Sequence, residues 1–286
     1  MSVSRRKFIQ ATGLLTAAGL LSRNELFAGN AKLKNYGLQL WSVKNALAKD
    51  PKGVLKQIAS FGYTQIESFE GSTGMFWGMT PTDFKKYVND LGMDALSSHF
   101  NDVYNASFEK KAADAATAGL KFLILPGEAG SKTVDDYKKL ADRFNACGEI
   151  CKKNGLKVGY HNHDAIFKPI DGQVPLDILI NNTDKGNVIF EMDIYWVVTA
   201  GADPVAYSKK YKNRFRLGHV KDRIKNSTEE DASCTLGEGS INYPAMVKDL
   251  KANGMEYFIV EQERYDNTTE MDSAKADAKY MSMLPI

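Results

Sequence analysis

The chain is poor in cysteine and lacks the glycine-rich signature of nucleotide-binding folds. It has three cysteines in 286 residues, and Cys147 and Cys151 lie four residues apart in a segment with helical periodicity. A disulfide framework is therefore not expected, and packing is the expected role of these side chains. No G-x-G-x-x-G follows the first expected strand, where the chain reads Leu40-Trp41-Ser42. This absence argues against a dinucleotide-binding sheet.

Neither sign of charge is in excess. The chain has 37 lysines and arginines against 35 aspartates and glutamates, for a formal net charge of +2. A nucleic-acid partner requires a basic surface, so none is expected. Hydrophobic residues make up 43% of the chain, which is enough to fill the core of one large α/β domain. Assembly into a homo-oligomer is left open by these numbers.

The hydrophobic run near the N-terminus is short. Ser4-Arg5-Arg6-Lys7-Phe8-Ile9 has the paired arginines of a twin-arginine signal, and the uncharged residues 10–22 follow it. This run is too short to span a bilayer comfortably, so no stable membrane span is expected. We interpret residues 1–28 as a twin-arginine signal peptide, which predicts export of the folded protein to the periplasm. A basic amphipathic first helix is the alternative.

Short apolar strands alternate with longer polar–apolar helices over residues 29–286. Strands are expected at 36–41, 63–67, 94–99, 121–126, 157–161, 188–193, 215–220 and 257–261. Helices are expected near 51–61, 80–91, 106–118, 133–153, 174–182, 203–212, 243–252 and 270–282. Eight such units predict an α/β fold, a single (β/α)8 TIM barrel, with its active site at the carboxyl ends of the strands. A doubly wound open sheet is the less favoured alternative.

Histidines and carboxylates gather at the expected strand ends. All four histidines of the chain lie there, as do several acids: His99, His161, His163, His219, Glu67, Asp193, Glu261 and Glu263. Because side chains alternate along a strand, His161 and His163 share one face, and so do Glu261 and Glu263. Imidazole and carboxylate are the nitrogen and oxygen ligands of zinc, manganese and related ions. The pattern therefore predicts a metal enzyme.

Four motifs at these strand ends, and a fifth at residues 236–239 that follows no expected strand, resemble the xylose isomerase-like barrel superfamily. This is the sugar phosphate isomerase/epimerase group, which also includes inosose dehydratases and type IV AP endonucleases. The motifs are Gly159-Tyr160-His161-Asn162-His163-Asp164, Phe190-Glu191-Met192-Asp193-Ile194-Tyr195-Trp196, His219-Val220-Lys221-Asp222, Leu236-Gly237-Glu238-Gly239 and Val260-Glu261. The resemblance covers essentially everything after the signal peptide.

The resemblance implies one divalent metal ion held by Asp193, His219 and Glu261, from strands six, seven and eight. Many relatives read Glu-Asn-His in strand five, whereas this chain has His161-Asn162-His163. His161 is therefore expected as the fourth ligand; its alternative roles are a hydrogen-bond partner of a ligand or a base. Loss of one negative charge favours zinc, manganese or iron over magnesium.

The other strand-end residues are expected around the substrate. The candidate catalytic residues are Glu261, Glu67, His163 and Lys221. The first three would move protons and Lys221 would stabilise an enediolate oxygen, although His163 is equally an orienting partner or a substrate contact. A salt bridge with Asp222 is the alternative for Lys221. The candidate substrate contacts are Trp41, His99, Trp196 and Glu263.

These features favour a metal-dependent sugar isomerase or epimerase that removes a proton next to a carbonyl, through an enediolate. The partner would be a small carbohydrate, and the cofactor one manganese, zinc, iron or magnesium ion. A hydratase or lyase acting on a keto-sugar or cyclitol, like inosose dehydratase, is the rival within enzymes. A periplasmic sugar-binding module is the alternative outside catalysis.

Overall fold

The computed structural model describes residues 32–103, 107–127 and 130–286. The expected signal peptide, residues 1–28, lies outside the described residues. Within them, no helix is both long enough and apolar enough to cross a membrane.

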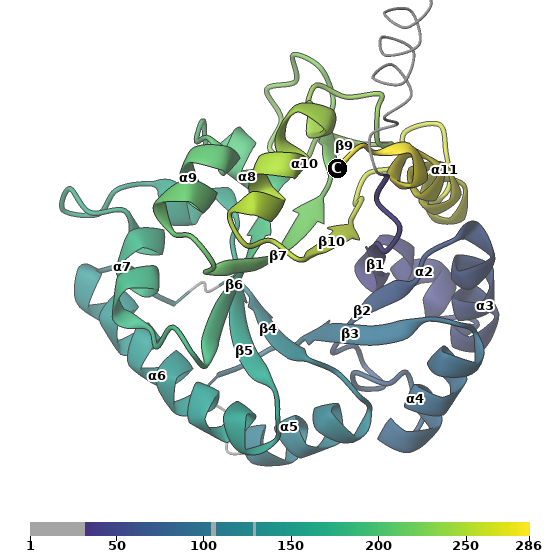
Figure 1. Ribbon diagram of the computed structural model, residues 1–286, viewed down its shortest axis with the longest axis horizontal. Helices are drawn as coiled ribbons and strands as arrows, with labels where there is room; N and C mark the ends of the chain where they lie inside the picture. The colour runs from purple at the N-terminus through teal and green to yellow at the C-terminus, as the bar shows by residue number, and fades with distance from the viewer. Residues whose placement is uncertain (1–31, 104–106, 128–129) are drawn as a thin grey trace, which may run out of the picture.

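Eight parallel strands close into one barrel, in the order β1-β10-β7-β6-β5-β4-β3-β2 (Figure 1). The strands are β1 (Gly37–Gln39), β2 (Gln65–Phe69), β3 (Asp94–His99), β4 (Phe122–Pro126), β5 (Lys157–His161), β6 (Val188–Asp193), β7 (Phe215–Val220) and β10 (Tyr257–Val260). Each strand pairs with the next one along the chain, and β1 pairs with β10 to complete the circle. The predicted TIM barrel is thus confirmed.

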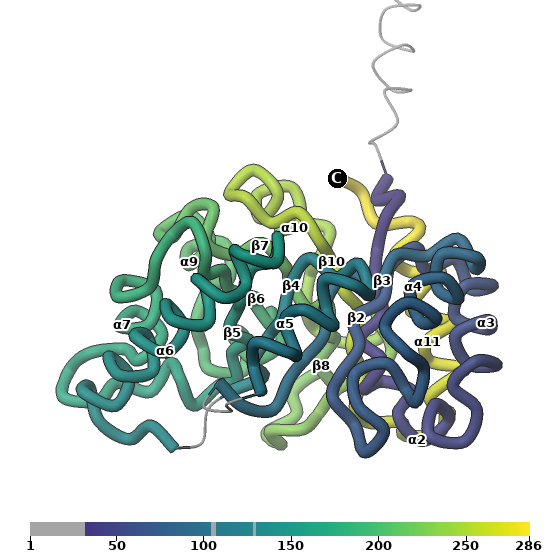
Figure 2. Tube along the Cα trace, turned by 90° about the horizontal axis from the view of Figure 1, so that it is seen from below, coloured from purple at the N-terminus to yellow at the C-terminus, as the bar shows by residue number. Residues whose placement is uncertain are grey.

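Helices surround the barrel, as Figures 1 and 2 show. They are α3 (Pro51–Phe61), α4 (Pro81–Asp90), α5 (Phe108–Thr117), α6 (Val134–Lys153), α7 (Pro175–Asn182), α9 (Pro204–Lys210), α10 (Tyr243–Ala252) and α11 (Glu270–Met283). Capping side chains begin several of them where the sequence predicts: Asp50, Thr80 and Asp203 each accept a backbone N–H from the first turn.

Some short elements were not predicted from sequence. They are the 3-10 turns Leu40–Val43 and Asp164–Phe167, the helices α2 (Lys44–Leu47) and α8 (Ile194–Thr199), and a hairpin of β8 (Asp222–Arg223) and β9 (Ser233–Cys234). Helix α8 is rich in β-branched and aromatic residues, which favour strands. It forms because Asp193, at the end of β6, caps it by accepting the N–H of Trp196.

Strand β2 lies two residues later than predicted. The sequence predicts a strand at 63–67 that ends on Glu67, but β2 runs from Gln65 to Phe69. Tyr63 lies before the strand, and its hydroxyl donates to the carbonyl of Ala274 in α11. Glu67 therefore lies in the middle of β2, deeper in the barrel than a residue at the strand end.

The barrel interior has two layers of side chains. The lower layer is a separate apolar cluster: Leu96, Phe122, Ile124, Ile189, Leu217 and Ile259. The upper layer, nearer the carboxyl ends of the strands, consists of buried ionisable residues: Glu67, His99, His161, Glu191, Asp193, His219 and Glu261. Gly159 of β5 leaves room for the lower layer, because a Cβ there would lie 2.6 Å from Ile124 Cδ1 and 2.7 Å from Ile189 Cδ1.

Candidate metal centre

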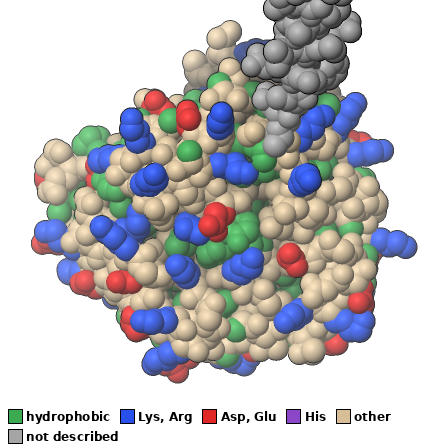
Figure 3. All heavy atoms as spheres, in the orientation of Figure 1, with side chains coloured by type: hydrophobic (Ala, Val, Ile, Leu, Met, Phe, Trp, Pro, Cys, Tyr) green, Lys and Arg blue, Asp and Glu red, His purple; other side chains and the backbone are tan. Residues whose placement is uncertain are grey.

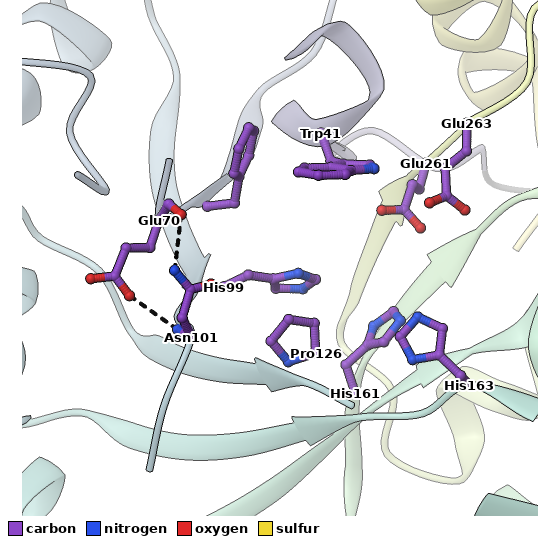
Figure 4. A pocket seen from close by; sticks show the side chains of 10 residues that line it. Trp41, Glu70, His99, Asn101, Pro126, His161, His163, Glu261 and Glu263 are labelled. Carbon is purple, nitrogen blue, oxygen red and sulfur yellow. Dashed lines mark hydrogen bonds between the residues drawn. The ribbon is translucent and has the colours of Figure 1, made fainter. Parts of the chain in front are cut away.

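The upper layer opens into a cavity of about 280 Å³ at the carboxyl ends of the strands. Figure 4 shows the imidazoles of His99, His161 and His163 near the carboxylates of Glu261 and Glu263. The cavity is lined by Trp41, Phe69, Glu70, His99, Asn101, Pro126, His161, His163, Glu261 and Glu263. On the face drawn in Figure 3, lysines and arginines are mixed with acids and no histidine side chain is visible, so the cluster does not open there.

Three of the residues expected to bind metal, Asp193, His219 and Glu261, offer ligand atoms within 4.8 Å of one another, and His161 lies beside Asp193. We call these four the ion-site residues: His161, Asp193, His219 and Glu261. His219 Nδ1 lies 3.2 Å from Glu261 Oε2 and 3.9 Å from Asp193 Oδ2. His161 Nε2 lies 3.7 Å from the same Asp193 oxygen. Zinc bonds of about 2.0–2.2 Å in a tetrahedron separate neighbouring ligand atoms by a little over 3 Å, so this spacing suits a shared ion.

Asp193 provides the clearest sign that a cation fits here. Its Oδ2 is buried and has no hydrogen-bond partner among the described residues. Its other oxygen caps α8, and its backbone is held by Asn162, whose side chain bonds both the N–H and the C=O of Asp193. A buried carboxylate oxygen without a partner is costly, and a metal ion would satisfy it.

The electrostatics of His161 and His219 also suit metal binding. Burial, reinforced by the nearby charge of His219, holds the pKa of His161 well below its usual value, so this imidazole is neutral. Burial also lowers the pKa of His219, but Glu191 and Glu261 outweigh it and raise that pKa well above its usual value. The proton that these carboxylates hold on His219 is positive charge that a bound ion would replace.

Two buried carboxylates lie beneath the ion-site residues. Glu191 Oε2 is 3.0 Å from His161 Nδ1, and Glu67 Oε1 is 2.8 Å from His219 Nε2. His99 Nε2 lies between them, 3.0 Å from Glu191 Oε2 and 3.1 Å from Glu67 Oε1. Burial lowers the pKa of His99, but Glu67 and Glu191 raise it to about 10, so His99 is a cation between two carboxylates.

Glu67 is not where a substrate base would be. It is fully buried, does not line the cavity, and also accepts hydrogen bonds from Gln39 at 2.7 Å and Ser97 at 2.5 Å. Burial raises its pKa, but His99 and His219 outweigh it and lower that pKa well below the usual range. The structure therefore places Glu67 under the histidines, facing away from the cavity.

His163 lines the cavity beside the ion-site residues. Its ring centroid lies 5.1 Å from that of His161 and 5.6 Å from that of Trp196. Burial lowers the pKa of His163 to about 4, so the imidazole is neutral near pH 7 and able to accept a proton. Trp196 packs against His163 and does not itself line the cavity, whereas Trp41, 37% exposed, lies at its edge.

Lys221 lies behind the cavity wall. Its side chain is fully buried, with Nζ 3.6 Å from Glu261 Oε2 and in an ion pair with Glu263. The same ammonium group lies over the rings of Tyr195 and Trp196, at 4.9 and 5.1 Å from their centroids. It does not pair with Asp222, whose carboxylate instead accepts backbone N–H groups of the loop that contains Gly237 and Gly239.

Sequence reasoning missed several residues of this centre. Glu191, which the sequence analysis names only as part of a motif, lies at the hub of the upper layer and, with His99, His161 and His219, forms a second group with metal-ligand spacing. The sequence could have indicated that Glu191 points into the barrel, because it lies two residues before Asp193 and therefore on the same face of β6. Four more residues line the cavity: Phe69 and Pro126 end strands β2 and β4, and Glu70 and Asn101 lie in the loops after β2 and β3.

Comparison with known proteins places this fold and site in a family. A model of the xylose isomerase-like TIM barrel matches residues 55–283. The chain belongs to this family. An inosose dehydratase from Clostridium perfringens is 30% identical over 145 residues, which cover 46% of this chain and 48% of the dehydratase. The chain thus spans about half the length of the curated relatives it matches.

Solved structures of the xylose isomerase-like barrel superpose on this chain. A sugar phosphate isomerase/epimerase from Parabacteroides distasonis gives a TM-score of 0.75 at 30% identity, over 86% of this chain and 97% of that one. The IolI protein, whose crystal structure contains a zinc atom, gives a TM-score of 0.68 at 14% identity, over 86% and 95% of the two chains. The second likeness shows the shared fold.

Proposed function

We propose that this xylose isomerase-like protein is a metal-dependent sugar isomerase or epimerase. The observation that carries the proposal is the convergence of His161, Asp193, His219 and Glu261, with an unpartnered Asp193 oxygen, next to a cavity lined by a neutral imidazole. The imidazole at position 161 favours zinc, manganese or iron over magnesium, and zinc bound in the IolI structure is consistent with this preference. A bound ion supplies Lewis-acid polarisation of a substrate carbonyl.

His163 and Glu261 are the proposed proton carriers. Both line the cavity, and the neutral His163 imidazole accepts a proton from the carbon next to the carbonyl. Return of that proton to the neighbouring carbon gives isomerisation. Epimerisation would need a second proton, taken up by Glu261 from water and delivered to the opposite face, while His163 gives its own proton to solvent. Glu67 is left out of this pair because it does not reach the cavity.

Lys221 would act on the substrate through Glu261 and Glu263. Its ammonium pairs with both carboxylates from behind the cavity wall, which fixes their orientation. Burial raises the pKa of Glu261, but Lys221 and His219 outweigh it and lower that pKa. The Trp41 ring at the cavity edge suits the apolar face of a sugar.

The substrate is proposed to lack a phosphate group. No lysine or arginine is among the described residues that line the cavity, whereas phosphate recognition in proteins commonly uses such side chains. An unphosphorylated sugar also fits the export that the paired arginines predict.

A hydratase or lyase acting on a keto-sugar or cyclitol is the second candidate. The 30% identity to inosose dehydratase over part of the chain favours it. It begins with the same proton removal but then expels or adds water or an alcohol. A sugar-binding role without catalysis would require none of the proton carriers.

One experiment tests the shared first step. The metal-loaded protein is incubated in deuterated water with a panel of unphosphorylated keto-sugars and keto-cyclitols, and deuterium is located by NMR. We expect deuterium next to the carbonyl in at least one compound, with an isomer, an epimer or an elimination product identifying the reaction. Binding of these compounds without any deuterium entry would support a binding protein instead.

Export is proposed separately. Arg5→Lys combined with Arg6→Lys should hold the precursor inside the cell, because the twin-arginine pathway reads the pair. An unchanged periplasmic yield of the double variant would show that these arginines are not an export signal.

A further inference from the structure

We propose that Glu191 is a positioning residue that fixes the tautomer of His161 and thereby turns the Nε2 lone pair toward the ion site. The inference rests on the metal site of the proposed function. It assigns a role to an acid that neither touches the cavity nor belongs to the four ion-site residues.

The two nitrogens of His161 face different carboxylates. Nδ1 lies 3.0 Å from Glu191 Oε2, within hydrogen-bonding distance, while Nε2 lies 3.7 Å from Asp193 Oδ2. A neutral imidazole has one N–H and one lone pair. An ionised Glu191 only accepts, so the N–H then belongs at Nδ1 and the lone pair at Nε2 faces the ion site.

His219 has the same arrangement with its nitrogens exchanged. Nε2 lies 2.8 Å from Glu67 Oε1, and Nδ1 lies 3.2 Å from Glu261 Oε2. In each case a fully buried carboxylate holds the nitrogen that faces away from the ion site. Because the same arrangement occurs on two histidines from two strands, we infer that the buried carboxylates orient the imidazole rings.

Glu191 is itself held in place from one side only. His99 bridges it to Glu67, with Nε2 at 3.0 Å from Glu191 and 3.1 Å from Glu67. Its second oxygen, Oε1, is buried with no hydrogen-bond partner among the described residues. Within the part of the chain that the structure describes, no backbone N–H donates to the Glu191 carboxyl group, and its contacts are those with the histidines.

A rival arrangement puts an ion deeper in the barrel. His99, His161, Glu191 and His219 offer ligand atoms within 4.8 Å of one another. An ion there would need the lone pairs of His161 Nδ1 and His219 Nε2, which would turn both N–H groups toward Asp193 and Glu261 and close the upper site. Glu191 also does not line the cavity, whereas Glu261 of the upper site does, so the upper site is the one within reach of a substrate.

The test is zinc binding and histidine tautomers in the full-length protein, compared with Glu191→Gln. Asp277→Asn is the matched control, because Asp277 is a buried acid on α11 that accepts the N–H of Leu236 and is not among the cavity residues. Zinc affinity is measured by competition with a chelator, and stoichiometry by metal analysis. With only four histidines in the chain, 15N NMR resolves each ring, and a His161→Gln spectrum assigns the one in question.

We expect one zinc per chain in the wild type, with His161 protonated at Nδ1 and bound through Nε2. Glu191→Gln should weaken zinc binding by about 10–100-fold, the usual cost of removing such a partner. It should also populate the other His161 tautomer in the zinc-free protein, because an amide can donate as well as accept. Asp277→Asn should change neither quantity.

Three results would overturn the inference. One is unchanged affinity and tautomer in Glu191→Gln, and another is two zinc ions in the wild type falling to one in the variant. The third is a wild-type His161 protonated at Nε2, which is measurable even where Glu191→Gln does not fold. Failure of the proposed metal site itself has a different signature, namely a wild type that binds no divalent ion.

Discussion

The lower and upper layers of the barrel interior are built on the same strands, yet they differ in every physical respect. In β6 the lower layer holds Ile189 and the upper layer holds Glu191 two residues later; in β7 the pair is Leu217 and His219. Burial of the lower side chains stabilises the fold by about 25 cal/mol per Å² of apolar surface removed from water. Burial of the upper side chains destabilises the fold unless their charges are paired or bound to a cation.

This contrast separates stability from chemistry within one barrel. Apolar packing below closes the barrel regardless of what binds above. The ionisable residues above tolerate burial because His99 and Lys221 balance several carboxylates, and a divalent ion would balance more. Changes in the lower layer should therefore affect unfolding, and changes in the upper layer should affect binding and turnover.

Replacing the proposed proton carrier should have the largest effect of any single substitution on turnover. His163→Gln should lower kcat by about 10²–10⁴-fold, the usual contribution of general acid–base catalysis. Bound metal and thermal stability should stay near the wild-type values, because His163 is not an ion-site residue. Turnover close to wild type would remove His163 from the mechanism and return the role to another cavity residue.

Truncation in the lower layer should have the opposite profile. Leu217 is fully buried, so Leu217→Ala should lower the free energy of unfolding by about 2–5 kcal/mol, measured by urea denaturation. The folded fraction should keep its metal content and its kcat. Loss of metal from correctly folded Leu217→Ala would show that the two layers are coupled and would break the comparison.

Restoring the family's usual acid in strand five should have a moderate effect. His161→Glu should still bind metal, because carboxylate and imidazole donors lie at similar distances from zinc, about 2.0–2.2 Å. Turnover should fall about tenfold, because the new carboxylate lies next to Glu191 and raises the proton affinity of the acids around it. Adding Glu191→Gln should relieve this repulsion and recover part of the loss. If the single variant kept full activity, the histidine at position 161 would not change the function relative to the glutamate of the family.

A buried acid outside both layers gives the smallest effect. Burial raises the pKa of Asp277 to about 7. The folded state therefore holds this proton more tightly than the unfolded state, and the resulting stability is present at low pH and lost as pH rises toward 7. Asp277→Asn should remove about 1 kcal/mol per pH unit from the slope of unfolding free energy between pH 5 and 7. An unchanged slope would mean that Asp277 titrates normally.

The sequence predicted the barrel well because each unit carries its own local signals. Alternating apolar runs and capped helix starts, such as Thr80-Pro81, place elements within a few residues. The ion-site residues lie close together because they are at or next to the ends of their strands, where the fold gathers them, and their binding of a metal stays a prediction.

Errors arose where the exact end of a strand, or a partner distant in the chain, decides how deep in the barrel a side chain lies and what it contacts. A strand expected at 63–67 made Glu67 a strand-end base, whereas β2 runs to Phe69 and buries it. Glu191 was undervalued for a related reason, since its partner His99 is 92 residues away along the chain. No local pattern reports that contact. The cavity residues on loops, such as Asn101, were beyond reach for the same reason.

The central claim is that the upper layer binds one divalent ion through Asp193, His219, Glu261 and His161. Metal analysis of the purified wild type and of the double variant Asp193→Ala, His219→Ala tests it most directly. Both proteins should fold, because the lower layer is unchanged, and circular dichroism would check this. We predict one ion per chain in the wild type and none in the double variant, with activity lost together with the metal. A double variant that retains stoichiometric metal, or a folded wild type that takes up none, would contradict the account.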